Sequence, residues 1–396
     1  MTNLTWTSAW GNAVSIAEHH PQAYAKDITL RYPVYMPFSG DALRFTFDNY
    51  CGSEPVTISG ATISSASFSL SDKAPLSCDV TAKSICDITF DGKAAVSIDA
   101  HKTVVSDPVS FPVEKGSTLC VSIYFSDFTL MQSAVMITGP LSKGFFSLGD
   151  QTHTASLSID TSKTTNWFYF LSNIDILTDD KNHAILCYGD SITAQAWPDY
   201  LTLFAKDAVS NHTSFIRRAT SGSRVLREYH CITYDSYGLK GKNRFLHEAP
   251  TSGAKAIIIQ QGINDIIHPV GVETNPFRPM SDLPTAGELI DGYQWYIEQA
   301  KKLDYKVYMG TLLPIHGWRT YAPFREELRN EVNSWICHTN DIDGCIDFDA
   351  ALRDERNPSA FREGFDSGDH LHPSAAAYKA MAKCAYDKLF SDGFIS

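Results

Sequence analysis

The chain has 396 residues, of which 43% are hydrophobic and 20% charged, so its size and composition favour a globular protein of two domains. A formal net charge of −12 and a pI near 5.5 argue against nucleic acid or an anionic membrane surface as partner, because either needs clustered Lys and Arg. A neutral or weakly charged small-molecule or oligosaccharide substrate fits this balance better. Nothing in the sequence predicts the oligomeric state.

The N-terminus and the cysteines favour the cytoplasm. Met1 to Trp6 lacks the basic and apolar regions of a signal peptide, and no apolar run approaches the roughly 20 residues of a membrane span. The 9 cysteines are scattered and odd in number, so at least one has no disulfide partner within the chain. Cys120 and Cys187 lie in apolar runs, where we expect reduced, buried thiols. A secreted protein that has lost its signal peptide would look the same.

Residues 1–178 have the pattern of short strands. Leu43, Phe45 and Phe47 alternate with polar residues, and Gly, Pro, Ser and Asp punctuate such runs throughout this region. This pattern predicts an all-β domain, a jelly-roll-like sandwich. The polar stretch Thr178 to Asn182 separates it from the rest of the chain.

Residues 182–396 alternate between strands and helices. The predicted strands are Ala184 to Tyr188, Ser214 to Arg218, Ala254 to Gln260, Lys306 to Leu313 and Gly344 to Phe348. Thr285 and Glu288 form a capping box that predicts one helix, and Ser374 after Pro373 begins the last helix. This rhythm indicates a flavodoxin-like, three-layer α/β/α domain with a five-stranded parallel sheet.

The apolar run from Ile185 ends at Gly189, Asp190 and Ser191, which places a serine in a tight turn at the carboxyl end of a strand. A serine there needs a base and an oxyanion hole to perform acyl transfer. His372 is the candidate base, and Asp369, three residues earlier, can accept the other imidazole proton.

Four short blocks stand in a defined order along the chain. They contain Ser191, then Gly222, then Gly262 with Asn264, and finally Asp369 with His372. In this order the chain resembles the SGNH hydrolase superfamily, the GDSL-type esterases and lipases, and within it a two-domain bacterial subgroup with an N-terminal β-sandwich. The resemblance implies the same α/β fold, a Ser191–His372–Asp369 triad, and no cofactor or metal.

The resemblance also assigns the oxyanion hole. Its donors would be the backbone N–H groups of Ser191 and Gly222 and the side-chain amide of Asn264. Asp190 and Asp265 could be read as a glycosidase-like carboxylate pair. The family pattern instead makes them structural, bonding the backbone amides of the loops.

A metal site is the alternative for the last block. If the segment is extended, His370 and His372 point to the same side and, with Asp366 or Asp369, could bind a metal ion. The family spacing of three residues between Asp and His favours Asp369 and His372, so we predict no metal.

Two loops are candidates for substrate binding. The segment from His268 to Pro284 is long, rich in Pro and Gly and without a helical pattern, as an active-site lid would be. His316 and Trp318 follow another strand, and Trp318 could stack on a sugar ring or fill an acyl pocket. We therefore take His268, His316 and Trp318 as substrate-binding candidates, with surface decoration as the alternative for each.

These features predict a serine esterase that hydrolyses carboxylic esters through an acyl-enzyme. A β-sandwich ahead of such a domain is similar to carbohydrate esterases of family 2, which remove acetyl groups from plant polysaccharides and their oligosaccharides. An acetyl xylan esterase-like activity is therefore favoured. A general short-chain esterase or lipase stays open, as does a carbohydrate-binding protein with an inactive hydrolase domain.

Overall fold

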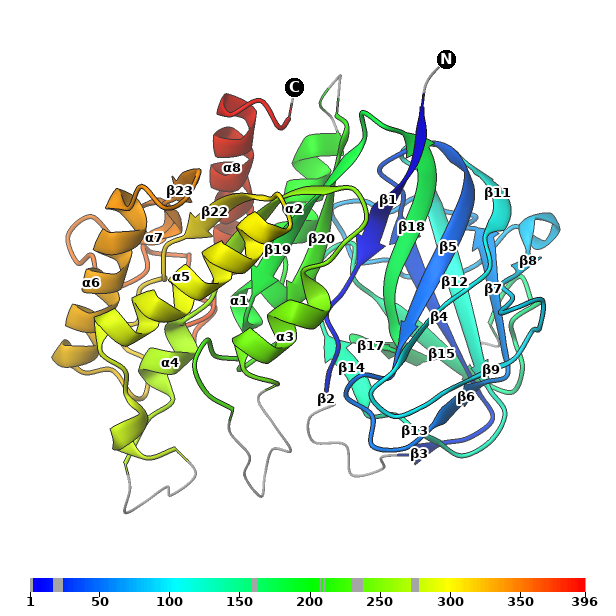
Figure 1. Cartoon of the computed structure of the whole chain (residues 1–396), viewed down its shortest axis with the longest axis horizontal. Coiled ribbons are helices and arrows are strands. Elements are labelled where there is room, and N and C mark those ends of the chain that lie inside the picture. The colour runs from blue at the N-terminus through cyan, green and yellow to red at the C-terminus, as the bar shows by residue number, and fades with distance from the viewer. Residues whose placement is uncertain are drawn as a thin grey trace. The chain divides into compact units, whose positions relative to one another are not determined.

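The computed structural model (Figure 1) describes residues 3–16, 24–157, 163–206, 208, 211–228, 238–271 and 278–395. The chain divides into two compact units. The first comprises Met1–Ala184 and His212–Ile216, and the second comprises Ile185–Asn211 and Arg217–Ser396. Within the first unit the polar stretch before residue 183 is a tight turn, in which Asn182 Nδ2 donates to Thr178 Oγ1 at 2.7 Å.

The first unit consists mostly of strands. They are β1 (Leu4–Gly11), β2 (Ser15–Ile16), β3 (Tyr24–Ala25), β4 (Ile28–Tyr35), β5 (Gly40–Asp48), β6 (Val56–Ile58), β7 (Gly60–Ser65), β8 (Cys86–Asp87), β9 (Val96–Ile98), β10 (Thr103–Val105), β11 (Val109–Val113), β12 (Thr118–Phe125), β13 (Thr129–Leu130), β14 (Ser133–Met136), β15 (Gly144–Leu148), β16 (Lys163–Thr165), β17 (Trp167–Tyr169) and β18 (Leu171–Asp179), with one 3₁₀ turn, η1 (Ala82–Ser84).

Two sheets form most of this unit. One has the order β1-β18-β5-β10, with β11 also paired to β5, and the other has the order β16-β15-β4-β12-β7-β8. Their pairings are antiparallel, for example β12 with β4 and β18 with β5. The predicted strand-rich character of this region is thus confirmed, and its sandwich and jelly-roll connectivity stay predictions.

The alternating pattern of β5 has the predicted effect on burial. Leu43, Phe45 and Phe47 are fully buried, while Arg44 lies half-buried on the other face and pairs with Asp175 at 2.8 Å. Because side chains alternate between the two faces of a strand, one face of β5 enters the core.

The second unit is built on a five-stranded sheet surrounded by helices, and two of the strands begin in residues that belong to the first unit. The strands are β19 (His183–Gly189), β20 (Thr213–Ala219), β21 (Ala254–Gln260), β22 (Lys306–Gly310) and β23 (Gly344–Ile346). The helices are α1 (Ser191–Ala194), α2 (Trp197–Lys206), α3 (Gly241–Glu248), α4 (Ile263–Ile267), α5 (Ala286–Lys302), α6 (Pro323–His338), α7 (Phe348–Leu352) and α8 (Ala375–Ser391), with a 3₁₀ turn, η2 (Met280–Asp282).

The sheet has the strand order β20-β19-β21-β22-β23, which is the flavodoxin-like order predicted for a doubly wound domain. The pairs β21–β22 and β22–β23 are parallel. Helix α5 packs on α3 and α6, and α8 packs on α2 and α7, so two groups of helices accompany the sheet (Figure 1). The α/β prediction is confirmed.

Both predicted helix starts are present. Thr285 caps α5 with the reciprocal bonds of a capping box to Glu288, and the side chain of Ser374 accepts from Ala377 N at the start of α8. The apolar stripe of α5 is buried, including Leu289 and Tyr293. Local sequence therefore determines where these two helices begin.

Two strands end earlier than predicted. β22 ends at Gly310 because the backbone of Leu312 bonds to a side chain, donating to Asn333 Oδ1 at 2.7 Å and accepting from Asn333 Nδ2 at 2.8 Å. β23 ends at Ile346 because Asp347 turns to cap α7, accepting from Ala350 N at 3.0 Å.

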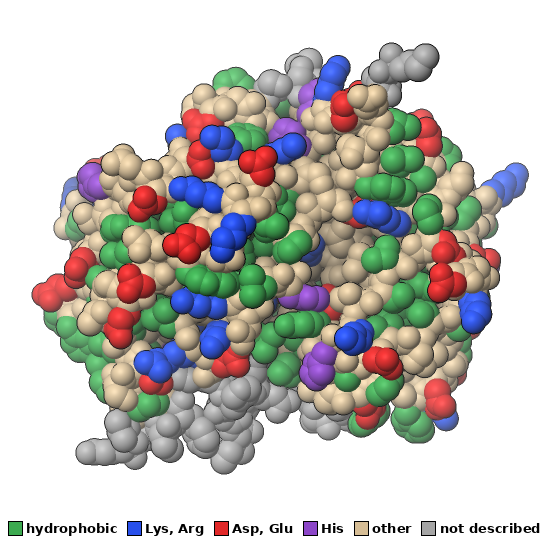
Figure 2. All heavy atoms as spheres, in the orientation of Figure 1, with side chains coloured by type: hydrophobic (Ala, Val, Ile, Leu, Met, Phe, Trp, Pro, Cys, Tyr) green, Lys and Arg blue, Asp and Glu red, His purple; other side chains and the backbone are tan. Residues whose placement is uncertain are grey.

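None of the helices in the described ranges is long and apolar enough to cross a membrane. On the face drawn in Figure 2, the acidic and basic side chains of the described residues are interspersed among apolar ones and form no basic stripe.

Candidate active site

The predicted nucleophile lies at the carboxyl end of β19. The strand ends at Gly189, and α1 begins at Ser191 with Asp190 as its N-cap, whose Oδ1 accepts from Ile192 N at 3.0 Å. A Cβ atom on Gly189 would lie 2.3 Å from the carbonyl oxygen of Gln260 on β21. Glycine therefore lets the turn that carries Ser191 sit directly against the neighbouring strand.

Ser191, His372 and Asp369 form a continuous hydrogen-bonded relay. Ser191 Oγ and His372 Nε2 are 2.9 Å apart, and His372 Nδ1 and Asp369 Oδ2 are 2.6 Å apart. The two partners of the imidazole thus occupy its opposite nitrogens, which is the arrangement that general-base activation of a serine requires. The structure brings together all three side chains that the sequence singled out.

Asp369 is held as a carboxylate. Partial burial opposes its ionisation, but hydrogen bonds from the side chain and backbone of His372 outweigh that effect and lower the pKa of Asp369 below its usual range. The backbone N–H groups of Leu371 and His372 donate to Oδ1 at 3.0 and 2.8 Å, leaving Oδ2 for the imidazole. Asp369 therefore carries the negative charge that orients His372.

His370 has a different partner. Its Nδ1 lies 2.5 Å from Asp366 Oδ2, and its backbone has a φ of 64°, in the left-handed region. Its ring lies against Gly317, where an added Cβ would be 2.7 Å from His370 Cγ. The positive φ breaks the extended geometry that would align His370 with His372.

The alternative of a metal ion shared by His370 and His372 would need a third ligand beside them. Among the residues that the structure describes, no three His, Cys, Asp or Glu side chains are grouped to hold a metal ion. His370 and His372 instead bind separate aspartates.

The structure links the blocks that contain the predicted oxyanion donors. Asn264 Nδ2 donates to Ser223 O at 3.1 Å, next to Gly222, and Gly222 has a φ of 75° that suits glycine. Asp265 accepts from Val225 N at 2.9 Å and from Leu226 N at 3.0 Å. These bonds fix the Gly222 loop to the start of α4.

Asp265 and Asp190 have the structural character that the family pattern implied, since both bond backbone amides. Burial raises the pKa of Asp190 to about 7 and that of Asp265 to about 6, although backbone N–H donors act against the rise in each. Both side chains are almost fully buried, at 0% and 3% exposure. Each aspartate thus stabilises a loop by accepting its backbone N–H groups. Neither is exposed to solvent as a glycosidase acid would be.

Gln260, Gln261 and Tyr378 support the site but were not predicted from the sequence. Thr193 Oγ1 donates to Gln260 Oε1 at 3.0 Å, and Gln261 Nε2 donates to Ser223 Oγ at 2.8 Å, so the two glutamines after the β21 run link both loops. Tyr378 of α8 is buried, and the charges of Asp190 and Asp369 add to burial in raising the pKa of its hydroxyl. Polar residues that directly follow an apolar strand were the signal for the glutamines. The tyrosine gave none.

The first predicted substrate loop is only partly described. Residues 272–277 of the His268 to Pro284 segment lie outside the described residues, and η2 shows that the segment is not entirely free of helical turns. Val270 N donates to Arg278 O at 3.0 Å, so the described ends of the loop meet. His268 is 6% exposed, and burial lowers the pKa of its imidazole well below the usual value, which keeps the ring neutral.

The second loop places His316 and Trp318 near the surface. The ring of exposed His316 lies 4.9 Å from that of Tyr321. Trp318 is half-buried, the guanidinium of Arg319 lies 4.6 Å from its ring, and its buried Nε1 has no hydrogen-bond partner among the described residues. Arg319 thus occupies part of the ring surface that a sugar would need.

One family model and several solved structures are similar to the α/β part of this chain. A model of the GDSL-like Lipase/Acylhydrolase family matches residues 187–380. Among solved structures, a GDSL-like lipase from Bacteroides thetaiotaomicron is 17% identical, with 54% of this chain and 89% of that chain covered and a TM-score of 0.36. Axe2, an acetylxylan esterase from Geobacillus stearothermophilus, is 18% identical, with 54% and 94% covered and a TM-score of 0.39. No curated protein matches the sequence.

The range that the family model matches includes Ser191, Asp369 and His372, whose side chains are joined by hydrogen bonds. The chain therefore carries, in residues 187–380, a domain of the GDSL-like lipase/acylhydrolase family.

Proposed function

We propose that the protein is a serine esterase in which Ser191 attacks the acyl carbon of a carboxylic ester. The observation that carries this proposal is the relay from Ser191 Oγ through His372 to Asp369. His372 accepts the serine proton as Ser191 attacks and returns it to the leaving alcohol. Water, activated by the same histidine, then releases the acid from the acyl-enzyme.

The charge on Asp369 supports these roles. Because its pKa is lowered, Asp369 is ionised near neutral pH and stabilises the imidazolium that forms when His372 takes up the serine proton. The tetrahedral oxygen is met by the N–H groups of Ser191 and Gly222 and by the amide of Asn264. Asn264 has one amide hydrogen on Ser223 O and a second available for the oxyanion.

For the substrate, we propose O-acetylated oligosaccharides derived from plant polysaccharides. Support comes from the order of the two units, with a strand-rich unit preceding the hydrolase domain as in carbohydrate esterases of family 2. The half-buried indole of Trp318, partly covered by Arg319, supplies an aromatic surface for a sugar ring.

The test compares two substrate series. Release of acetate from acetylated xylo- and manno-oligosaccharides would be measured beside hydrolysis of p-nitrophenyl esters of increasing chain length. The proposal predicts a higher kcat/KM on at least one acetylated oligosaccharide than on p-nitrophenyl acetate, and a steep fall beyond short acyl chains. Efficient cleavage of long-chain esters, with no release from the oligosaccharides, would make the protein a general esterase or lipase.

A Trp318→Ala variant sharpens this test. We expect it to raise KM for acetylated oligosaccharides and to leave the aryl acetate unchanged, because the small ester needs only the relay and the oxyanion donors. Arg319→Ala is the matched control, since it removes the cation from the ring and exposes the indole. Equal losses of kcat/KM on the oligosaccharides and on the aryl acetate would show that Trp318 does not bind the sugar.

A further inference from the structure

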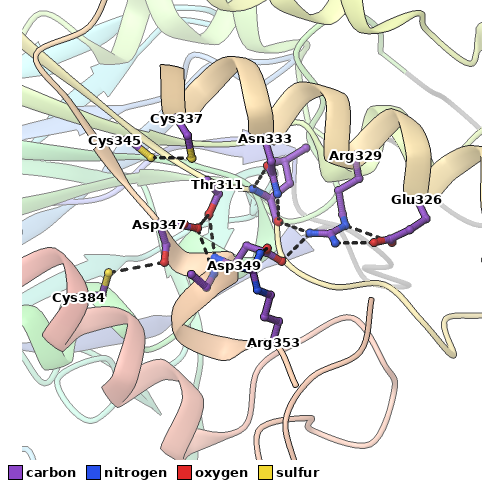
Figure 3. Close-up of polar contacts among 12 residues, drawn as sticks. Thr311, Glu326, Arg329, Asn333, Cys337, Cys345, Asp347, Asp349, Arg353 and Cys384 are labelled. Carbon is purple, nitrogen blue, oxygen red and sulfur yellow. Dashed lines mark hydrogen bonds and ion pairs between the residues drawn. The ribbon is translucent and has the colours of Figure 1, made fainter. Parts of the chain in front are cut away.

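Two cysteines from different elements meet at the edge of the parallel sheet. Cys337 lies in the last turn of α6 and Cys345 in the middle of β23, and their side chains point toward one another in Figure 3. Their Sγ atoms are 3.3 Å apart, against the length of about 2.05 Å of a disulfide bond. Closing the bond therefore needs a sulfur displacement of little more than about 1 Å.

The protein holds both cysteines in place from either side. Toward the start of α6, Asn333 and Arg329 both donate to Leu312 O, at 2.8 and 2.9 Å. The residues between the two cysteines are fixed as well, since Asp343 accepts from Val307 N at 2.8 Å. The sulfurs thus meet between two anchored backbones.

The two thiols differ in accessibility and acidity. Cys337 is exposed and Cys345 half-buried. Burial raises the pKa of both thiols, and the hydrogen bond between them offsets part of the rise for Cys337 and adds to the rise for Cys345. The exposed Cys337 is thus the thiol that ionises first, and an ionised, accessible thiol is the one that reacts.

We propose that Cys337 and Cys345 are a thiol–disulfide exchange site for small-molecule disulfides of the glutathione class. Cys337 thiolate attacks one sulfur of the oxidised molecule, forming a mixed disulfide and releasing one thiolate. Cys345, after losing its proton, attacks Cys337 Sγ and releases the second thiolate. The protein loses two electrons and two protons, and the small disulfide is reduced to two thiols.

A third cysteine provides an internal control. Cys384 on α8 is half-buried, and its Sγ lies 3.8 Å from the carbonyl oxygen of Asp347 (Figure 3). Burial raises the pKa of Cys384 to about 11, so it stays a protonated thiol near neutral pH. It resembles Cys345 in exposure but has a backbone oxygen as its partner.

The experiment treats the folded full-length protein with oxidised glutathione and maps the products by mass spectrometry. Digestion with trypsin and an Asp-specific protease cuts between the cysteines, at Asp341 and Asp343, so only a disulfide keeps the two fragments joined. We expect the joined fragments, two hydrogen atoms lighter than their sum. In Cys345→Ser, Cys337 should stop at the glutathione adduct, whereas Cys384→Ser should still give the joined pair.

A second measurement separates a prepared site from a chance reaction. The equilibrium constant for oxidation by glutathione should be at least about tenfold larger in native protein than in urea, because the fold holds the sulfurs together. The melting temperature should rise by about 5 °C on oxidation and return on reduction. A native constant no larger than that in urea, loss of the joined fragments in Cys384→Ser, or a wild-type reaction that stops at the adduct would each overturn the proposal.

Discussion

The nucleophile and its base are presented by two segments of opposite character. Asp190 and Ser191 lie in a buried turn, with exposures of 0% and 8%, whereas the Asp369 and His372 side chains are 42% and 23% exposed. Burial raises the pKa of Asp190, and hydrogen bonds to His372 lower that of Asp369. Asp190 thus keeps its proton to a higher pH and supports the serine turn, whereas Asp369 is ionised and orients the histidine.

The difference shows how one fold keeps chemically identical side chains in separate roles. An aspartate beneath a loop holds its shape by accepting backbone N–H groups, as Asp190 and Asp265 do. An aspartate in an accessible loop is free to orient an imidazole. Substitutions in both segments test this division.

The largest effect is expected from Ser191→Ala. Removal of the attacking oxygen should lower kcat on an aryl acetate by about 10⁶-fold, the usual consequence of losing a triad nucleophile. The melting temperature should change little, because one buried hydroxyl is lost without a new cavity. Near-normal turnover by the folded variant would exclude Ser191 as nucleophile.

His372→Ala should be nearly as damaging, with a loss of about 10⁴-fold or more in kcat. His370→Ala is the matched control, since it removes the same ring two residues away but leaves the Asp369–His372 pair intact. We expect less than about a tenfold loss there. Comparable losses in the two variants, or recovery of chelator-treated enzyme by zinc, would favour a metal site.

Asp190 should make stability depend on pH. Its pKa of about 7 in the folded protein lies above the ordinary value of 3.8, so the folded state holds the proton more tightly. The free energy of unfolding should therefore fall as pH rises from about 4 to about 7, by about 4 kcal/mol from this group. Asp190→Asn keeps the acceptor for Ile192 N and should remove most of that slope.

Denaturant titrations of both proteins at several pH values measure this effect. A smaller slope from Asp265, whose pKa is about 6, should survive in the Asp190→Asn protein. An unchanged slope in the variant would show that Asp190 is already ionised at low pH in the folded protein.

Asn264→Ala should have the smallest of these effects. Loss of one oxyanion donor lowers kcat by about 100- to 1000-fold, or roughly 3–4 kcal/mol, with little change in ground-state binding. Its bond to Ser223 O is also lost, so Asn264→Asp, which keeps the shape but not the donors, is the companion variant. A change confined to KM would assign Asn264 to substrate binding.

Much of the fold was predictable because its signals are local. The apolar runs located the strands of the second unit, and Thr285 and Ser374 marked two helix starts. The ends of β22 and β23 were not predictable, since a bond to Asn333 and a cap at Asp347 determine them. The end of β22 thus depends on a contact between residues far apart in the chain, whereas the end of β23 depends on a local cap.

The site divides in the same way. Ser191, Asp369 and His372 could be named from spacing and resemblance, and the structure places them in hydrogen-bonding contact. The pairing of His370 with Asp366 could not be predicted, because it depends on the positive φ of His370. The meeting of Cys337 and Cys345 depends on how α6 returns to the sheet, which no motif records.

The close approach at Gly189 has a consequence for how this protein can change over time. Replacement of Ser191 by alanine removes the nucleophile and leaves the fold intact. A Cβ atom on Gly189 would instead lie 2.3 Å from Gln260 O and 2.4 Å from Thr193 Oγ1. A descendant that abandons catalysis can thus lose its serine at once and retain the glycine indefinitely. In such relatives we expect Gly189 to persist longer than Ser191.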